Sequence, residues 1–236
     1  EEEKEKAEQE KILAEQRNSF SMMYYLAITA EDIRSSKENR LVLEEIYTSS
    51  EILRGGYSEV DEKKVFIFAG RLDEFKGSLL LIESWGSMPE NYELRIFGSG
   101  QYEDRVERAQ KSHKNIVYEG FQPHKRIMEE LQNATAMLFP SCLYEGFPMS
   151  ISESFSVGCP VVSSDIGNQA SLLRESHGGV LFELNSQDSF IAAVKNVVEN
   201  RERFSEDAKH YYETHLTADE NYKRLIDIYD NARQAR

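Results

Sequence analysis

The stretch that decides the fold runs from Phe139 to Asn168 and reads FPSCLYEGFPMSISESFSVGCPVVSSDIGN. Apolar residues that end at Phe139 and the run Pro160–Ser163 both indicate buried strands. Between them, Pro148 stands where a first helical residue would, because its φ is preset and it has no N–H to leave unpaired. Met149–Val157 is then the expected helix, and Gly158 ends it. The stretch therefore predicts strand, loop, helix, turn and strand.

Two carboxylates stand in this stretch, Glu145 in the loop and Glu153 in the helix that follows it. The free N–H groups and partial positive charge of a helix start would hold a phosphate. Carboxylates accept hydrogen bonds from sugar hydroxyls, so the combination suits a sugar joined to a phosphate. The alternative interpretation is that both glutamates are ordinary solvated residues.

From Val65 onward, strand-like apolar runs alternate with helix-like segments. The expected strands are Val65–Ala69, Tyr92–Phe97, Ile116–Tyr118, Ala136–Phe139, Pro160–Ser163 and Gly179–Phe182. The expected helices are Ser78–Trp85, Tyr102–Lys111, Lys125–Gln132, Met149–Val157, Ala170–Arg174 and Asp188–Val198. This alternation predicts an α/β fold, a Rossmann-like parallel sheet with helices on both faces. Binding sites in such sheets lie at the carboxyl ends of the strands.

Three segments are expected along the chain. Residues 1–64 form an N-terminal helical or remnant segment, because Glu1–Arg17 is rich in strong helix formers. Residues 65–200 form the Rossmann-like domain, and residues 201–236 form C-terminal helices.

Two cations follow the first expected strand, in the sequence GRLDEFKG from Gly70 to Gly77. Arg71 and Lys76 bracket a loop that opens the next helix. A diphosphate is bound well by such a pair, arginine acting as a fork and lysine as a point charge. For this pair alone, a purely structural role is an equal alternative.

Taken together, the two motifs resemble those of the retaining GT-B glycosyltransferases, the glycosyl transferases group one clan. EGFPMSISE matches the family's E-x7-E signature, and GRLDEFKG matches its G-R-L-x-x-x-K-G motif. The resemblance implies that Glu145 contacts the donor sugar, Glu153 contacts the ribose, and Arg71 and Lys76 hold the diphosphate. Glu145, Arg71 and Lys76 are thus the expected catalytic residues. The residues implied in further donor contacts are Gly70, Phe121, Gln122, Gly146, Phe147, Pro148, Met149 and Ser150. In the family, Phe121 and Gln122 would meet the base. The family often has a Gly pair where this chain has Gly167-Asn168.

The resemblance implies a hexosyltransferase that moves a sugar from a UDP- or GDP-sugar to a glycan, lipid or protein acceptor with retention, in glycan or polysaccharide biosynthesis. No cofactor or metal is expected, since the cations replace the metal and no D-x-D motif is present. The resemblance covers the donor-binding half, and residues 1–64 are too few for a second Rossmann-like domain. We therefore expect a missing N-terminal GT-B domain or a partner chain, without which this chain alone would be inactive.

Three other functions stay open. A glycoside hydrolase would also use two carboxylates. A non-catalytic nucleotide-sugar-binding module or subunit would fit the missing half. A nicotinamide-dependent oxidoreductase would use Gly98 and Gly100, which follow a strand and open a helix, with Glu119 further on. Glu103, however, stands where that motif needs its third glycine and would repel a pyrophosphate.

Composition narrows the possible functional classes further. The chain has 236 residues and a net charge of −14, which argues against a nucleic-acid partner. Cys142 and Cys159 have no metal or redox spacing, so we expect reduced thiols. No signal peptide is evident and no apolar run approaches the roughly 18 residues of a membrane span. We expect a cytoplasmic protein, with a peripheral position at the inner membrane face left open.

Overall fold

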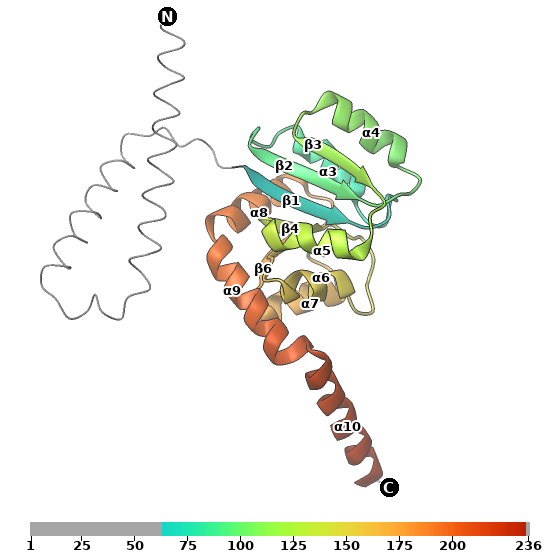
Figure 1. Cartoon of the computed structure of the whole chain (residues 1–236), viewed down its shortest axis with the longest axis vertical. Helices are drawn as coiled ribbons and strands as arrows, with labels where there is room; N and C mark the ends of the chain where they lie inside the picture. Colours follow the sequence, from blue (N-terminus) through green and yellow to red (C-terminus); the bar gives the residue numbers. More distant parts are fainter. Residues whose placement is uncertain (1–62, 235–236) are drawn as a thin grey trace, which may run out of the picture. The chain divides into compact units, whose positions relative to one another are not determined.

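A computed structural model describes residues 63–234 of the chain. The expectation for residues 1–64 lies outside the described residues, apart from its last two positions. Within the described part, strands and helices alternate from Lys64 to Glu199, and helices follow to the end (Figure 1). The strands are β1 Lys64–Ala69, β2 Tyr92–Phe97, β3 Ile116–Gly120, β4 Ala136–Phe139, β5 Val161–Ser164 and β6 Gly179–Phe182. The helices are α3 Ser78–Trp85, α4 Glu103–Ser112, α5 His124–Asn133, α6 Met149–Ser156, α7 Gly167–Ser176, α8 Gln187–Glu199, α9 Arg201–Tyr211, the π-helix η2 Tyr212–Leu216 and α10 Ala218–Gln234.

The strands form one six-stranded sheet in the order β3-β2-β1-β4-β5-β6. Every neighbouring pair is parallel. All of these strands therefore end at the same side of the sheet, termed here the carboxyl edge. The loops at this edge are residues 70–77 after β1, 98–102 after β2, 121–123 after β3, 140–148 after β4, 165–166 after β5 and 183–186 after β6. The predicted parallel α/β fold is confirmed.

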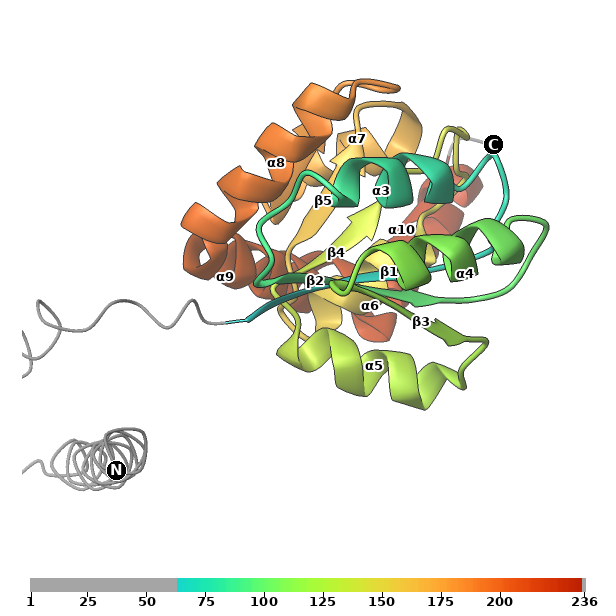
Figure 2. The ribbon, with the colours of Figure 1, turned by 90° about the horizontal axis from the view of Figure 1, so that it is seen from above.

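Helices cover both faces of the sheet. Figure 2 shows α3, α4 and α8 on one side and α5 and α6 on the other. Successive side chains of a strand point to opposite faces, so Phe66 and Phe68 join the first layer while Ile67 joins the second. Because each face is buried under helices, β1, β4 and β6 read as nearly continuous apolar runs, while β2 carries the paired charges of Glu93 and Arg95.

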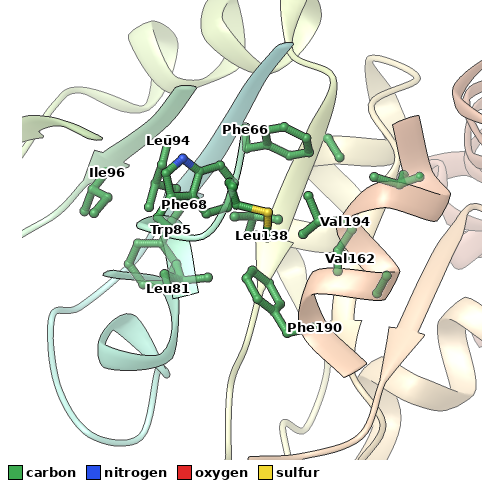
Figure 3. Packing of buried hydrophobic residues seen from close by; sticks show 14 of the residues in the cluster. Phe66, Phe68, Leu81, Trp85, Leu94, Ile96, Leu138, Val162, Phe190 and Val194 are labelled. Carbon is green, nitrogen blue, oxygen red and sulfur yellow. The ribbon is translucent and has the colours of Figure 1, made fainter. Parts of the chain in front are cut away.

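The core under α3 and α8 combines aromatic and aliphatic side chains (Figure 3). Trp85 meets Phe66 edge-to-face with ring centroids 5.2 Å apart, a favoured aromatic geometry. The Trp85 indole donates a hydrogen bond of 3.0 Å to the Tyr92 carbonyl. Its polar N–H therefore stays satisfied although the side chain is fully buried.

Element boundaries differ from the expected ones by a few residues. The largest difference concerns α7, which was expected at Ala170–Arg174 and extends from Gly167 to Ser176. Its first residues, Gly-Asn-Gln, are poor or neutral helix formers and read as a turn. Pro148, expected at the first helical position, is instead the cap residue of α6, which begins at Met149. Gly158 has φ 70° and ends α6 as predicted.

The last helix, α10, leaves its side chains in solvent. All residues from Asn221 to Asn231 are exposed. They include the large apolar side chains Tyr222, Leu225, Ile226, Ile228 and Tyr229. Among residues 63–234, none of the helices combines the length and apolar character that crossing a membrane requires.

Candidate functional site

The loop after β1 is folded around Asp73. Asp73 Oδ1 accepts hydrogen bonds from the backbone N–H groups of Phe75 and Lys76, at 3.0 and 2.9 Å. Its other oxygen lies 3.0 Å from Arg71 Nη2. An aspartate commonly organises a turn by accepting from the backbone two or three residues later. Asp73 thus fixes the loop that carries both expected cations, a role that the sequence motif did not single out.

Gly77 lets this loop approach the loop after β4. Its φ is 73°, and a Cβ atom there would lie 2.1 Å from the Pro140 carbonyl oxygen. The Cys142 N–H donates a hydrogen bond of 2.8 Å to the Phe75 carbonyl across the same junction. Since β1 and β4 are neighbours in the sheet, the two loops that carry the motifs are held together.

This junction brings Lys76 and Glu145 into direct contact. Lys76 Nζ lies 2.5 Å from Glu145 Oε1, although 69 positions separate the residues in sequence. The Ser141 hydroxyl donates to the same carboxylate oxygen at 3.1 Å. Both side chains are about three-quarters buried, being 25% and 22% exposed. A cation from one motif and a carboxylate from the other therefore lie on the same side of the sheet.

A cavity of about 380 Å³ opens at the carboxyl edge. It is lined by Ala69, Gly70, Arg71, Phe97, Gly98, Ser99, Phe121, Gln122, His124, Ile127, Leu131, Met137, Ser150 and Glu153. Six of the expected site residues are in this lining: Gly70, Arg71, Phe121, Gln122, Ser150 and Glu153. Its floor is apolar and its mouth carries charged groups, as in many small-molecule sites.

The Lys76–Glu145 pair is not part of the cavity lining, and neither are Gly146, Phe147, Pro148 and Met149. These residues belong to loop 70–77 and to the segment that leads into α6. Phe147 and Met149 are exposed, as are Phe75, Phe121 and Tyr144. Large apolar side chains therefore rim the carboxyl edge.

Glu153 has a partner that the motifs did not indicate. His124, the first residue of α5, places Nε2 3.1 Å from Glu153 Oε1. Both side chains line the cavity, and His124 is 66% exposed. Beside them, the Gln122 amide donates a hydrogen bond of 2.8 Å to the Glu119 carbonyl. The local sequence does not single out His124, because its partner Glu153 lies on another helix.

Gly98 serves loop packing. A Cβ atom at Gly98 would lie 1.8 Å from the Gly70 carbonyl oxygen, so the glycine lets the loops after β1 and β2 touch. Glu103 is held by Tyr118, whose hydroxyl lies 2.6 Å from Glu103 Oε1. Burial and this carboxylate raise the pKa of Tyr118 well above its ordinary value. These contacts explain Gly98 and Glu103, the two residues considered under the dinucleotide hypothesis, by their structural roles.

The two thiols are poorly suited to nucleophilic chemistry. Burial raises the pKa of the Cys142 thiol and raises that of Cys159 to about 11. A thiol with a raised pKa is mostly protonated near neutral pH and reacts slowly. In residues 63–234, no group of three or more His, Cys, Asp or Glu side chains is placed to hold a metal ion.

Comparison with known proteins identifies the family. The model of the family described as glycosyl transferases group 1 matches residues 49–213. The lipopolysaccharide 1,6-galactosyltransferase of Salmonella typhimurium is 25% identical over 158 residues, which are 63% of this chain and 44% of that protein. The chain thus spans about half the length of the curated relatives it matches.

Solved structures share the fold. The apo form of the lipopolysaccharide outer core galactosyltransferase WaaB superposes with a TM-score of 0.54 at 24% identity, covering 66% of this chain and 47% of that one. Anabaena HepE in complex with UDP gives a TM-score of 0.62 at 16% identity, covering 78% and 52%. The sheet with its two helix layers corresponds to one Rossmann-like half of a GT-B fold. With the family model matching most of its length, this chain belongs to the glycosyl transferases group 1 family.

Proposed function

We propose that residues 65–200 form the donor-binding domain of a retaining glycosyltransferase that uses a nucleotide-diphosphate sugar. The observation that carries this proposal is the contact between Lys76 Nζ and Glu145 Oε1 at 2.5 Å. It joins a cation suited to a diphosphate and a carboxylate suited to sugar hydroxyls, beside a cavity that Arg71 and Glu153 line. A glycoside hydrolase would need the two carboxylates but not the cations.

The charges at this edge fit the leaving group of glycosyl transfer. The bond between the anomeric carbon and the diphosphate oxygen breaks, and negative charge builds on that oxygen. Arg71 and Lys76 would stabilise this charge, together with the start of α6 at Pro148–Ser150. The Arg71 side chain is 68% exposed and so can turn toward a ligand. Glu145 would orient the sugar. The acceptor oxygen would bond the anomeric carbon on the face that the diphosphate leaves, and the acceptor proton would pass to the departing diphosphate oxygen.

The nucleoside would occupy the cavity. Glu153 would accept hydrogen bonds from the ribose hydroxyls, with His124 beside it. Phe121 and Gln122, in the loop after β3, would meet the base. Of UDP and GDP, UDP is favoured, because HepE, which shares the fold, was solved with UDP.

The acceptor would be bound by chain outside the described residues or by a partner. The exposed apolar rim of Phe75, Phe121, Tyr144, Phe147 and Met149 supports this, since a rim of that kind marks a surface that another element covers. The acceptor class is a glycan, lipid or protein, and the process is polysaccharide or lipopolysaccharide synthesis. The proposed location is the cytoplasm, at the inner membrane face where a lipid-linked acceptor would be met.

Titration calorimetry of this chain with UDP and UDP-sugars tests the proposed donor binding. UDP should bind, and UDP-glucose or UDP-galactose should bind more tightly if the sugar is recognised. Arg71→Ala should weaken UDP binding by about 1–3 kcal/mol, the scale of a charge-assisted hydrogen bond. Arg108→Ala is the matched control, because Arg108 is an exposed arginine on α4.

Unchanged UDP affinity in Arg71→Ala would remove Arg71 from the site. If the wild-type chain bound none of the UDP-, GDP- or ADP-sugars, the donor-binding proposal would be wrong. A non-catalytic nucleotide-sugar-binding module or subunit is the alternative function. It predicts binding without transfer even when an acceptor-binding half is supplied.

A further inference from the structure

The loop that carries Glu145 is tied to the start of α7 by a series of side-chain hydrogen bonds. The Ser164 hydroxyl donates to the Ser141 carbonyl at 2.5 Å, and the Gln169 amide donates to the Leu143 carbonyl at 2.9 Å. Both donor side chains are fully buried. The carbonyl groups of Ser141 and Leu143 are thus bound by side chains from the end of β5 and the start of α7.

Asn168 completes the series at the functional end of the loop. Its side-chain amide donates to the Glu145 carbonyl at 2.9 Å and to the Gly146 carbonyl at 2.7 Å. One amide therefore bridges two successive peptide groups, one of them that of the proposed sugar-binding glutamate. A side-chain amide has two donor hydrogens, so both bonds can form together.

Gly167 makes the approach possible. Its φ is 57°, and a Cβ atom there would lie 3.1 Å from Tyr144 Cδ1 and 3.3 Å from Tyr144 Cα. The glycine thus brings the backbone of α7 against the loop. The following asparagine and glutamine can then reach the loop carbonyls.

We infer that Asn168 is a positioning residue that holds Glu145 in the orientation for the donor sugar. This inference rests on the proposed function of Glu145. Asn168 acts through the backbone of the loop and keeps the carboxylate beside Lys76 and Ser141. Without the Asn168 amide, the carbonyl groups of Glu145 and Gly146 would lose these two hydrogen bonds.

Asn168 is the residue to change, because its side chain is exposed while that of Gln169 is fully buried. Loss of an exposed amide leaves its partners able to bond water, whereas loss of a buried one leaves them unsatisfied. Asn168→Ala and the nearly isosteric Asn168→Asp should therefore fold. The aspartate keeps the volume but lacks both donors. Asn133→Ala is the matched control, since Asn133 is an exposed asparagine whose amide bonds the Glu129 carbonyl of its own helix.

The first measurement is the affinity for UDP and for UDP-glucose or UDP-galactose, taken as a ratio. In the two Asn168 variants, UDP affinity should stay within about twofold, while the preference for the UDP-sugar falls about threefold to tenfold. Asn133→Ala should change neither value. An unchanged ratio, or a parallel loss of both affinities, would overturn the positioning role. Absence of UDP binding by the wild-type chain would instead overturn the proposed function and this inference with it.

The second measurement is hydrogen–deuterium exchange without ligand. Exchange of the amides in residues 143–147 should become several times faster in Asn168→Ala and stay unchanged in Asn133→Ala. This readout separates positioning from direct contact with the sugar, because no sugar is present. Equal exchange in the variant and the wild type would show that Asn168 does not hold the loop.

Discussion

At the residue scale, the Lys76–Glu145 pair means that the proposed site neutralises its own charges before a donor arrives. Lys76 Nζ lies 2.5 Å from Glu145 Oε1. A diphosphate that binds Lys76 must therefore compete with this carboxylate. An ion pair of this partly exposed kind contributes about 0.2–1 kcal/mol, so the competition is modest. This competition couples the affinity for the diphosphate to the affinity for the sugar.

Glu145→Gln should separate these two effects. Removal of the negative charge frees Lys76, so the affinity for UDP should rise by about twofold to fivefold. The additional affinity for a UDP-sugar over UDP should fall, since the amide is a weaker acceptor for sugar hydroxyls. Titration calorimetry with both ligands measures the two changes, with Glu107→Gln on α4 as an exposed control. A lower UDP affinity in Glu145→Gln would contradict the competition.

At the scale of elements, a charge network joins the starts of β1 and β2 to α5. Glu93 lies 2.5 Å from Lys63 Nζ and 2.7 Å from Arg95 Nε, and Arg95 reaches Glu130 at 2.6 Å. Burial alone would raise the pKa of Glu93. The hydrogen bonds and charges of Lys63 and Arg95 outweigh it and hold the pKa below its ordinary value.

This pKa shift makes the stability of the sheet depend on pH. A carboxyl group with a lowered pKa stabilises the folded state fully above its ordinary pKa of 4.5 and loses that contribution as the pH falls through the folded-state pKa. Glu93→Gln should thus lower the free energy of unfolding by about 1–2 kcal/mol at neutral pH. The difference from wild type should shrink as the pH falls below 4.5.

Urea unfolding at pH 7 and pH 3 measures this difference, with Glu129→Gln on the exposed side of α5 as the control. A deficit of equal size at both pH values would mean that Glu93 acts through packing and not through its charge.

The sequence predicted the elements well where burial dictates the pattern and poorly where contacts between distant loops do. β1, β4 and β6 followed from continuous apolar runs because both faces of the sheet are covered. The start of α7 was missed because Gly167, Asn168 and Gln169 resemble a turn. Their side chains bond a loop more than 20 positions earlier. No local sequence pattern predicts hydrogen bonds between residues so far apart in the chain.

The same limit applies to the candidate site. The order of the two motifs allowed Lys76 and Glu145 to be placed at one edge, since parallel strands end together. Their direct contact depends on Gly77 and its approach to Pro140, which only the structure shows. His124 and Asn168 could not be predicted, because each acts through a partner on a different element.

At the scale of the whole molecule, the sheet and α10 are energetically separate. The family model ends at residue 213, before α10 begins at Ala218. All residues from Asn221 to Asn231 are exposed. A helix that buries so little surface contributes little to folding of the rest.

Truncation after Thr217 should therefore change the free energy of unfolding by less than about 0.5 kcal/mol, the range of surface substitutions. Truncation after Asn200 is the contrasting variant. It removes α9, whose Phe204, Ala208 and Tyr211 are buried, and should destabilise by several kcal/mol at about 25 cal/mol per Å² of apolar surface. Equal losses in the two truncations, measured by urea unfolding, would refute the separation.

Every group assigned to the donor, from Gly70 to Asn168, is carried by the loops at a single sheet edge or by the helices that begin there. Under the proposed function, the choice of nucleotide and sugar should therefore stay with this sheet when the acceptor-binding half is exchanged. A chimera that joins residues 63–217 to a foreign acceptor-binding half would inherit its donor from one parent and its product linkage from the other. The proposed function therefore assigns the choice of the transferred group to this sheet and the choice of acceptor to another part.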